Sequence, residues 1–225
     1  MSALILGATG LCGSGFLKAA EKADAFSKIF TLTRRPLPES DTVASQIVET
    51  DNSKWTGLIP DDTKFIFTAL ATTRGAVGGF DNQYKIDHDL NVDLAKAAKE
   101  KGCSTVVLVS SSGASLDSRF SYMRMKGEIE RDILALDFDH TIILRPGILL
   151  GDRDKGINHK GFGNGTAMCI GGWLYRSRVQ RLVGYPVYGD EVGKVGVHLA
   201  LRENAKKVQI VESKEILDIS DALKK

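Results

Sequence analysis

A glycine-spaced turn after the first apolar run constrains the fold of this chain more than any other feature. The run covers residues 3–6, and Gly7, Gly10 and Gly13 follow it at intervals of three. Glycine permits a tight turn and a close approach of the backbone to a ligand, and the N–H groups at a helix N-terminus attract a pyrophosphate. Such a motif is specific when it lies between a strand and a helix, so its position predicts a dinucleotide-binding loop.

The rest of the chain alternates between strand-like and helix-like segments. Strands are expected at residues 3–6, 28–33, 45–49, 64–69, 105–109 and 140–144, and helices at 16–21, 83–99 and 122–136. Runs that are apolar throughout, such as 105–109, are typical of strands buried on both faces. The pattern predicts an α/β fold with a Rossmann-like, doubly wound parallel sheet.

Length favours one domain. The chain has 225 residues, of which 43% are hydrophobic, enough for a sizeable core. We expect a single NAD(P)-binding domain over 1–225, with a cofactor-binding core over about 1–150 and a small C-terminal substrate cap over 151–225. In the cap, glycines between Gly151 and Gly172 indicate loops that close over a substrate, followed by a helix near 191–201, a strand near 207–211 and a helix near 213–223.

Charge and composition exclude several classes of protein. Thirty basic residues against 28 acidic ones give a net charge of +2, too balanced for a nucleic-acid-binding protein. No apolar run approaches the ~20 residues of a membrane-spanning helix, and the N-terminus does not resemble a secretion signal or a cleaved presequence. Cys12, Cys103 and Cys169 indicate a reducing compartment and no disulfide framework, and the scattered histidines predict no metal site.

The second strand ends in Arg34 and Arg35, where a protein selective for NAD usually has an acid. Two guanidinium groups favour the 2′-phosphate of NADP. Asp51, after the third strand, is placed equally well to meet the adenine amino group or to cap the next turn. With the loop after the fourth strand, the expected cofactor contacts outside the catalytic residues are Gly7, Thr9, Gly10, Leu11, Cys12, Gly13, Arg34, Arg35, Asp51, Leu70, Ala71 and Thr72.

A serine-rich strand end precedes a tyrosine and a lysine four residues apart. Ser110, Ser111 and Ser112 follow the fifth strand, and Tyr122 and Lys126 begin the next helix. Residues four apart share a helix face, so the ammonium can lower the phenol's pKa and also reach the nicotinamide ribose. Serine, tyrosine and lysine could therefore converge on one carbonyl.

These residues carry a resemblance to a known superfamily. The loop from Gly7 to Gly13, Ser110-Ser111, Tyr122 with Lys126, and Leu144-Arg145-Pro146-Gly147 resemble the short-chain dehydrogenases/reductases in their extended or atypical branch. More narrowly, residues 51–55, 67–74, 84–93 and 184–193 look like the fungal "found in mitochondrial proteome" family, a relative of the animal Tat-interacting oxidoreductase. This likeness covers nearly the whole chain.

The resemblance implies NADP(H) binding, oxidoreductase activity and peripheral association with the cytosolic face of the mitochondrial outer membrane, with a cytoplasmic location as the fallback. Tyr122 would be the general acid/base, Lys126 its partner and ribose ligand, and Ser111 the hydrogen-bond donor to the substrate, with Ser110 and Ser112 as alternatives. Pro146, Gly147 and Ile148 would contact the nicotinamide carboxamide, although this proline also serves to end the strand.

Other residues are interpreted more simply. Many short-chain dehydrogenases have an Asn in the helix after the fourth strand, and both Asn91 and His88 are candidates for that place. Asp87, Asp89 and Asp93 are explained by the favourable field at a helix N-terminus. The aromatic residues 173–175 with arginines at 176, 178 and 181 suggest a pocket wall or a homodimer contact more than a membrane-binding patch.

Two functions follow from the sequence. The first is an NADP-dependent oxidoreductase acting on a small carbonyl or alcohol substrate, and the second is a regulatory protein that binds NADPH with little turnover. A sugar-nucleotide epimerase is disfavoured because the chain after Leu150 is short for a nucleotide-sugar domain.

Overall fold

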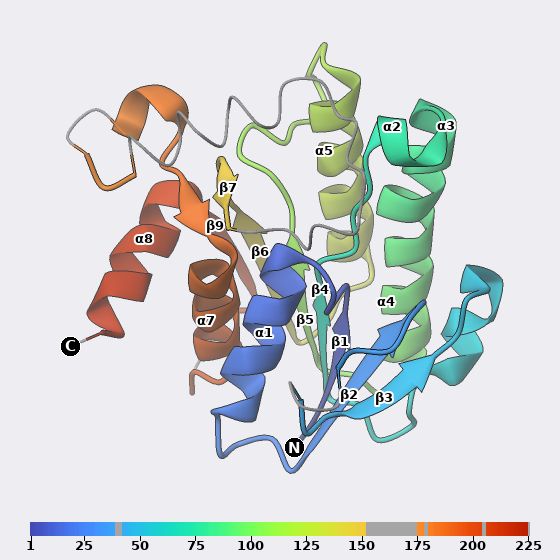
Figure 1. Ribbon diagram of the computed structural model, residues 1–225. Coiled ribbons are helices and arrows are strands. Elements are labelled where there is room, and N and C mark those ends of the chain that lie inside the picture. Colours follow the sequence, from blue (N-terminus) through green and yellow to red (C-terminus); the bar gives the residue numbers. More distant parts are fainter. Residues whose placement is uncertain (39–41, 152–174, 178–179, 204–205, 225) are drawn as a thin grey trace.

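The fold is organised by one seven-stranded sheet in which every neighbouring pair of strands is parallel (Figure 1). The computed structural model describes residues 1–38, 42–151, 175–177, 180–203 and 206–224. The strand order is β3-β2-β1-β4-β5-β6-β9. The strands are β1 (Ser2–Leu6), β2 (Lys28–Thr33), β3 (Ser45–Val48), β4 (Phe65–Thr68), β5 (Thr105–Val109), β6 (His140–Arg145) and β9 (Val208–Glu212).

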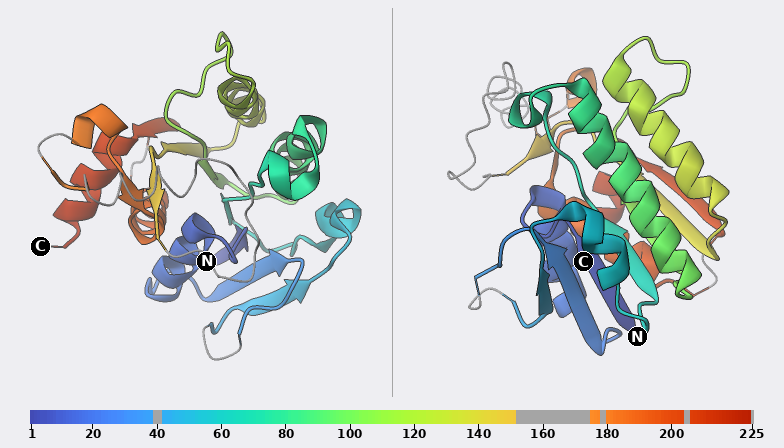
Figure 2. Two further views of the ribbon diagram at one scale, coloured as in Figure 1. Left: turned by 45° about the horizontal axis from the view of Figure 1, so that its top comes forward. Right: turned by 90° about the vertical axis from the view of Figure 1, so that its right-hand side faces the viewer.

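Helices cover both faces of the sheet. One face carries α1 (Leu11–Glu21), α7 (Gly189–Ala200) and α8 (Ser213–Ala222); the other carries the 3-10 helix η2 (Asn52–Leu58), α4 (Leu90–Glu100) and α5 (Ser121–Ala135) (Figures 1 and 2). Successive β1 side chains enter opposite cores, since Ala3 and Ile5 pack beneath α1 and α7 while Leu4 and Leu6 pack beneath α4. The predicted Rossmann-like fold is therefore confirmed.

Helices α1 and α7 meet through their backbones. A Cβ atom on Gly15 would lie 2.4 Å from the carbonyl oxygen of Gly189, and one on Gly193 would lie 2.0 Å from the carbonyl carbon of Gly15. Only glycine permits such an approach. This contact fixes α7 directly against α1, the helix that follows the glycine turn.

Shorter elements shape the carboxyl edge of the sheet. After β4 the chain forms α2 (Arg74–Val77), α3 (Phe80–Tyr84) and a π-helical turn, η3 (Lys85–Asp89), before α4. The helix expected over 83–99 is thus interrupted by a change of helical pitch. A small second sheet pairs β7 (Leu149–Leu150) with β8 (Val187–Tyr188). The 3-10 helix η4 (Gln180–Val183) comes just before β8 in the sequence.

The expected elements near 191–201, 207–211 and 213–223 are present as α7, β9 and α8. The expected substrate-closing loops between Gly151 and Gly172, and Trp173, Leu174 and Arg178 of the aromatic and arginine segment, lie outside the described residues. Among the helices that the structure describes, none has the length and apolar character needed to cross a membrane.

Candidate functional site

The glycine turn is packed so closely that side chains would obstruct it. Gly7 has a φ of 77°, and a Cβ on it would lie 2.7 Å from the carbonyl oxygen of Ala69. A Cβ on Gly13 would lie 2.0 Å from the carbonyl oxygen of Gly7. No side chain caps α1 at Gly10, and its first turn holds no acidic residue. The N–H groups of this turn are therefore suited to a pyrophosphate.

The end of β2 lies beside this turn because Leu32 pairs with Leu6. Arg34 and Arg35 follow it and are both exposed. The Thr33 hydroxyl donates to the Arg35 carbonyl at 2.7 Å, which shapes the bend. Within the described chain neither arginine forms an ion pair, so both guanidinium groups are open to an anionic ligand.

Asp51 caps the next turn, one of the two roles expected for it. Its carboxylate accepts hydrogen bonds from the Ser53 N–H at 3.0 Å and the Ser53 hydroxyl at 2.7 Å. These bonds lower the pKa of Asp51, the one from the hydroxyl most strongly. Contact with adenine stays a prediction.

The loop after β4 is held by polar side chains from the helix that follows. The Leu70 carbonyl accepts from Asn91 Nδ2 at 3.1 Å, the Thr72 N–H donates to Asp87 Oδ1 at 2.6 Å, and the Thr72 carbonyl accepts from Gln83 Nε2 at 3.0 Å. Leu70 and Thr72 are half-buried, and Ala71 between them is exposed. The loop expected along the cofactor is thus fixed at both ends.

The interpretation of Asp87 as a charge that merely favours the helix N-terminus is wrong. Asp87 is 0% exposed, and burial raises its pKa. Asp89 and Asp93 are exposed and fit that interpretation. Three buried polar residues, Gln83, Asp87 and Asn91, follow one another at intervals of four. They continue the buried face of α4 toward the N-terminus, and their spacing is visible in the sequence.

Asn91, not His88, occupies the place beside the strand end. Asn91 is 2% exposed and accepts a short hydrogen bond from the hydroxyl of Thr68, the last residue of β4. The His88 ring stacks on Tyr84 with centroids 4.5 Å apart, and its Nε2 lies 3.0 Å from Asp132 on α5. His88 therefore ties η3 to α5.

The three serines after β5 have different surroundings. Ser110 is 5% exposed and donates a short hydrogen bond to the carboxylate of Glu130. The Ser112 N–H donates to the Pro146 carbonyl at 2.9 Å. Ser111 and Ser112 are both half-buried, and the Ser111 hydroxyl makes a long contact of 3.4 Å with the Ser112 carbonyl. Ser110 thus has its hydroxyl engaged by Glu130, while Ser111 and Ser112 both stay candidates for the hydrogen bond to a substrate.

Tyr122 and Lys126 lie on one face of α5, as their spacing predicts. The Lys126 ammonium lies 5.9 Å from the centroid of the Tyr122 ring. Lys126 is 2% exposed, whereas Tyr122 is half-buried at the helix start. Helix α5 packs beside α4 on the same face of the sheet (Figure 2). The structure therefore brings the tyrosine and lysine to the edge that carries the glycine turn.

A partly buried ion pair, which no local sequence pattern indicates, braces this arrangement. Arg145 at the end of β6 donates to both carboxylate oxygens of Glu130, at 2.9 and 2.6 Å, and to Glu212 at 2.9 Å. The bond from Glu130 is the largest cause that raises the pKa of Arg145. Because Glu130 also accepts from Ser110, one carboxylate joins α5, β5 and β6. Only the fold brings these residues together.

Backbone groups after β6 already have partners within the protein. The Gly147 N–H donates to the Ser213 hydroxyl at 2.8 Å, and the Ile148 carbonyl accepts from Val187 at 3.0 Å. With the bond that Pro146 accepts, these contacts show that residues 146–148 turn the chain. Their expected contact with a carboxamide stays a prediction.

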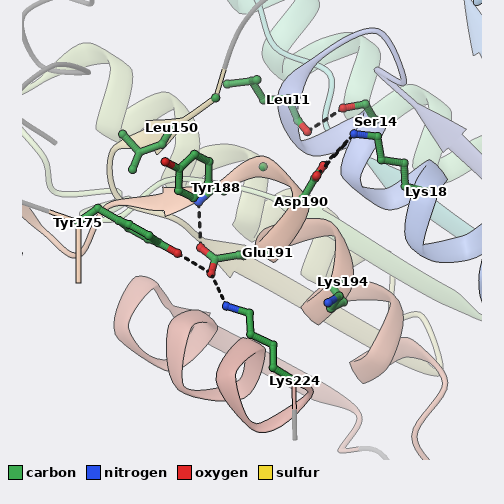
Figure 3. Close-up of a pocket in the computed structure, with 12 residues that line it drawn as sticks. Leu11, Ser14, Lys18, Leu150, Tyr175, Tyr188, Asp190, Glu191, Lys194 and Lys224 are labelled. Atoms are coloured by element: carbon green, nitrogen blue, oxygen red, sulfur yellow. Dashed lines mark hydrogen bonds and ion pairs between the residues drawn. The ribbon is translucent and has the colours of Figure 1, made fainter. Parts of the chain in front are cut away.

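A cavity of about 440 Å³ lies between the N-terminal halves of α1 and α7, with Leu150, Tyr175 and Lys224 also in its wall (Figure 3). Glu191 in its wall accepts from the Tyr188 N–H at 3.1 Å and from Tyr175 and Arg176 at 2.8 Å each. Burial alone would raise the pKa of Glu191, but these bonds outweigh it and lower the pKa. Leu11 is the residue that this cavity shares with the expected cofactor contacts.

Comparisons with known proteins connect this geometry to a family. The HIM1 family model matches residues 61–175. Protein FMP52, mitochondrial, from Saccharomyces cerevisiae is 63% identical over 100% of this chain and 99% of its own length. The Kluyveromyces lactis protein of the same name is 56% identical over 98% of this chain and 99% of its own length.

Solved structures resemble the fold at low sequence identity. MoeE5 in complex with UDP-glucose and NAD has a TM-score of 0.66 and 17% identity, over 99% of this chain and 82% of that protein. A short-chain dehydrogenase from Streptomyces avermitilis has a TM-score of 0.64 and 15% identity, over 99% of this chain and 92% of that protein. These likenesses show the fold, while the sequence relatives show that the chain belongs to the FMP52 family.

Proposed function

We propose that this protein is an NADP(H)-dependent oxidoreductase of the short-chain dehydrogenase type, acting on a carbonyl or alcohol substrate. The observation that carries the proposal is the placement of Tyr122 and buried Lys126 at the sheet edge where the glycine turn opens. A dinucleotide along this edge fits the general rule that ligands of open α/β sheets bind at the carboxyl ends of strands.

The residues divide the chemistry among them. A nicotinamide held at this edge would supply or accept the hydride. Tyr122 would give its phenolic proton to the substrate oxygen or take one from it. Lys126, whose ammonium lies 5.9 Å from the centroid of the Tyr122 ring, would assist the phenol and bind the nicotinamide ribose. Ser111 would donate a hydrogen bond to the substrate oxygen, a role compatible with the long contact of 3.4 Å that its hydroxyl makes among the described residues, and Ser112 is the alternative.

The choice of NADP over NAD rests on Arg34 and Arg35. Calorimetric titration with NADPH and NADH, repeated for an Arg34→Ala, Arg35→Ala double variant, tests it. We expect NADPH to bind more tightly than NADH and the double variant to lose that preference, since each charge-assisted phosphate contact contributes about 1.5–3 kcal/mol. Arg202→Ala, an exposed arginine that follows the C-terminal end of α7, is the control. Equal binding of both cofactors in the unaltered protein contradicts the assignment.

Turnover is tested by following NADPH oxidation with a panel of small aldehydes and ketones. Tyr122→Phe should abolish the activity and leave NADPH binding within about twofold. Tyr84→Phe, which removes the same kind of hydroxyl from α3, should preserve both. NADPH binding without turnover of any carbonyl would instead favour the regulatory protein that binds NADPH.

The relatives' names support a mitochondrial location, and we place the protein on the cytosolic face of the outer membrane as a peripheral protein. Fractionation with protease treatment of intact mitochondria tests this. The protein should sediment with mitochondria, be digested without rupture of the outer membrane and be released by alkaline carbonate. Protection from protease until the outer membrane is ruptured contradicts the proposed face.

A further inference from the structure

Two buried groups of opposite charge lie behind the candidate site. Asp87 is 0% exposed on η3, and Lys126 is 2% exposed on α5. The two elements pack against each other. Burial raises the pKa of Asp87, and the positive charge of Lys126 is the largest influence in the opposite direction. Each group is therefore part of the other's electrostatic environment.

The hydrogen bonds of Asp87 explain why residue 87 has a side-chain acceptor but not why that side chain is an acid. One carboxylate oxygen accepts from the Thr72 N–H at 2.6 Å, and the other lies 3.4 Å from Gln83 Nε2. An asparagine could supply an acceptor for the same N–H without bringing a charge into the interior. Because a buried charge is costly unless it is paired, the carboxylate needs a further reason.

Other charged groups near this place have different partners. On η3, His88 lies against Asp132 and Asp89. On α5, Glu130 faces Arg145 one turn beyond Lys126. On α3 and α4, the neighbours that face Asp87 are the uncharged amides of Gln83 and Asn91. In the described part of these elements, Lys126 is the cation whose charge lowers the pKa of Asp87, without an ion pair of 4 Å or less between the two.

We propose that Asp87 is the counter-ion of Lys126, which it keeps charged and in position, and is therefore a positioning residue for the proposed reaction. This inference rests on the proposed function, in which Lys126 serves Tyr122 and the cofactor. The carboxylate supplies a negative partner from behind, so the ammonium can remain charged inside the protein and still face the phenol. The same carboxylate holds Thr72, which couples the lysine to the loop expected along the cofactor.

A double-mutant cycle measures the pair without any cofactor. Asp87→Asn keeps an acceptor for Thr72 but removes the charge, and Lys126→Met keeps the side-chain stem but removes the ammonium. We expect each single change to raise the urea unfolding constant, because it leaves one charge buried alone. The unfolding constant of the double variant should be at least tenfold smaller than the value obtained by multiplying the two single effects. Folding of the double variant where a single variant fails to fold would give the same answer. Single effects that simply multiply would overturn the proposal.

The pH dependence of NADPH binding tests the link to function. The ratio of the Asp87→Asn dissociation constant to that of the unaltered protein should be near one at pH 6.5 and at least ten at pH 9. The reason is that a buried ammonium without a counter-ion loses its proton more readily. Taking the ratio at each pH cancels the titration of NADPH itself. Asp93→Asn, an exposed acid on α4, is the matched control and should leave the ratio at one throughout.

Two results separate the alternatives. A ratio that is the same at every pH, and that persists in a Lys126→Met background, would mean that Asp87 only anchors Thr72 and would overturn the proposal. If the unaltered protein fails to bind NADPH, the proposed function fails, and the functional part of this inference fails with it. The stability cycle would still decide whether Asp87 and Lys126 are paired.

Discussion

Replacing Gly13 with alanine should damage the glycine turn by a calculable amount. The added Cβ would lie 2.0 Å from the Gly7 carbonyl oxygen, 2.4 Å from its carbon and 2.8 Å from the Ala8 nitrogen. All three are backbone atoms, so the loop or the helix must move. Overpacking of this kind costs about 1–3 kcal/mol, while alanine within a helix regains about 1 kcal/mol. With the clash at the upper end, we expect a net loss of about 1–2 kcal/mol.

Thermal unfolding and NADPH titration of the same samples provide the assay. A loss of this size should lower the Tm by about 2–8 °C for a chain of this length, and the displaced N–H groups should weaken NADPH binding at least tenfold. Gly57→Ala is the matched control, since a Cβ there meets nothing within 4 Å. If Gly13→Ala matched the control in both Tm and affinity, the argument that this close packing forms the cofactor site would be refuted.

Three further predictions concern other parts of the molecule. Glu130→Gln should destabilise the fold by about 2 kcal/mol in urea denaturation, less than for a fully buried pair because Arg145 is partly exposed; a change below about 0.5 kcal/mol would contradict the bracing role. The pKa of Glu191 is lowered from 4.5 by its hydrogen bonds, so its contribution to stability is present above that value and lost as the pH falls through the lowered pKa. Glu191→Gln should accordingly lose less Tm than the unaltered protein between pH 5 and pH 3, and an equal loss would disagree with this reasoning. Burial raises the pKa of Cys103 to about 12, so iodoacetamide at pH 8 should modify it only in denaturant, as mass spectrometry of its peptide would show; rapid labelling of the folded protein would be inconsistent with that burial.

Features that depend on neighbouring residues could be predicted from the sequence. The strand, glycine turn and helix around Gly7 and Gly13 form one local unit, and the spacing of Tyr122 and Lys126 places them on one helix face without reference to the rest of the fold. The strands buried on both faces were evident from their continuous apolar runs. Local geometry alone decides each of these features.

Features that depend on distant pairing could not be predicted in the same way. Glu130 meets Arg145 only because β5 and β6 are neighbours and α5 crosses behind them. The inward orientation of Asp87 depends partly on the π-helical turn η3, which changes the phase of the helix ahead of α4. Its four-residue spacing from Asn91 was the available signal, because a polar residue in line with a buried helix face indicates a site or a network.

The backbone contact between α1 and α7 has a consequence for how the chain is made. Gly15 emerges from the ribosome long before its partners Gly189 and Gly193, so α1, which follows the glycine turn, is not covered by α7 during most of synthesis. Ordering the intervening chain before this contact forms costs loop-closure entropy and slows folding. A nascent chain arrested before α7 should therefore be sensitive to protease in its N-terminal half and become resistant once α7 has left the exit tunnel.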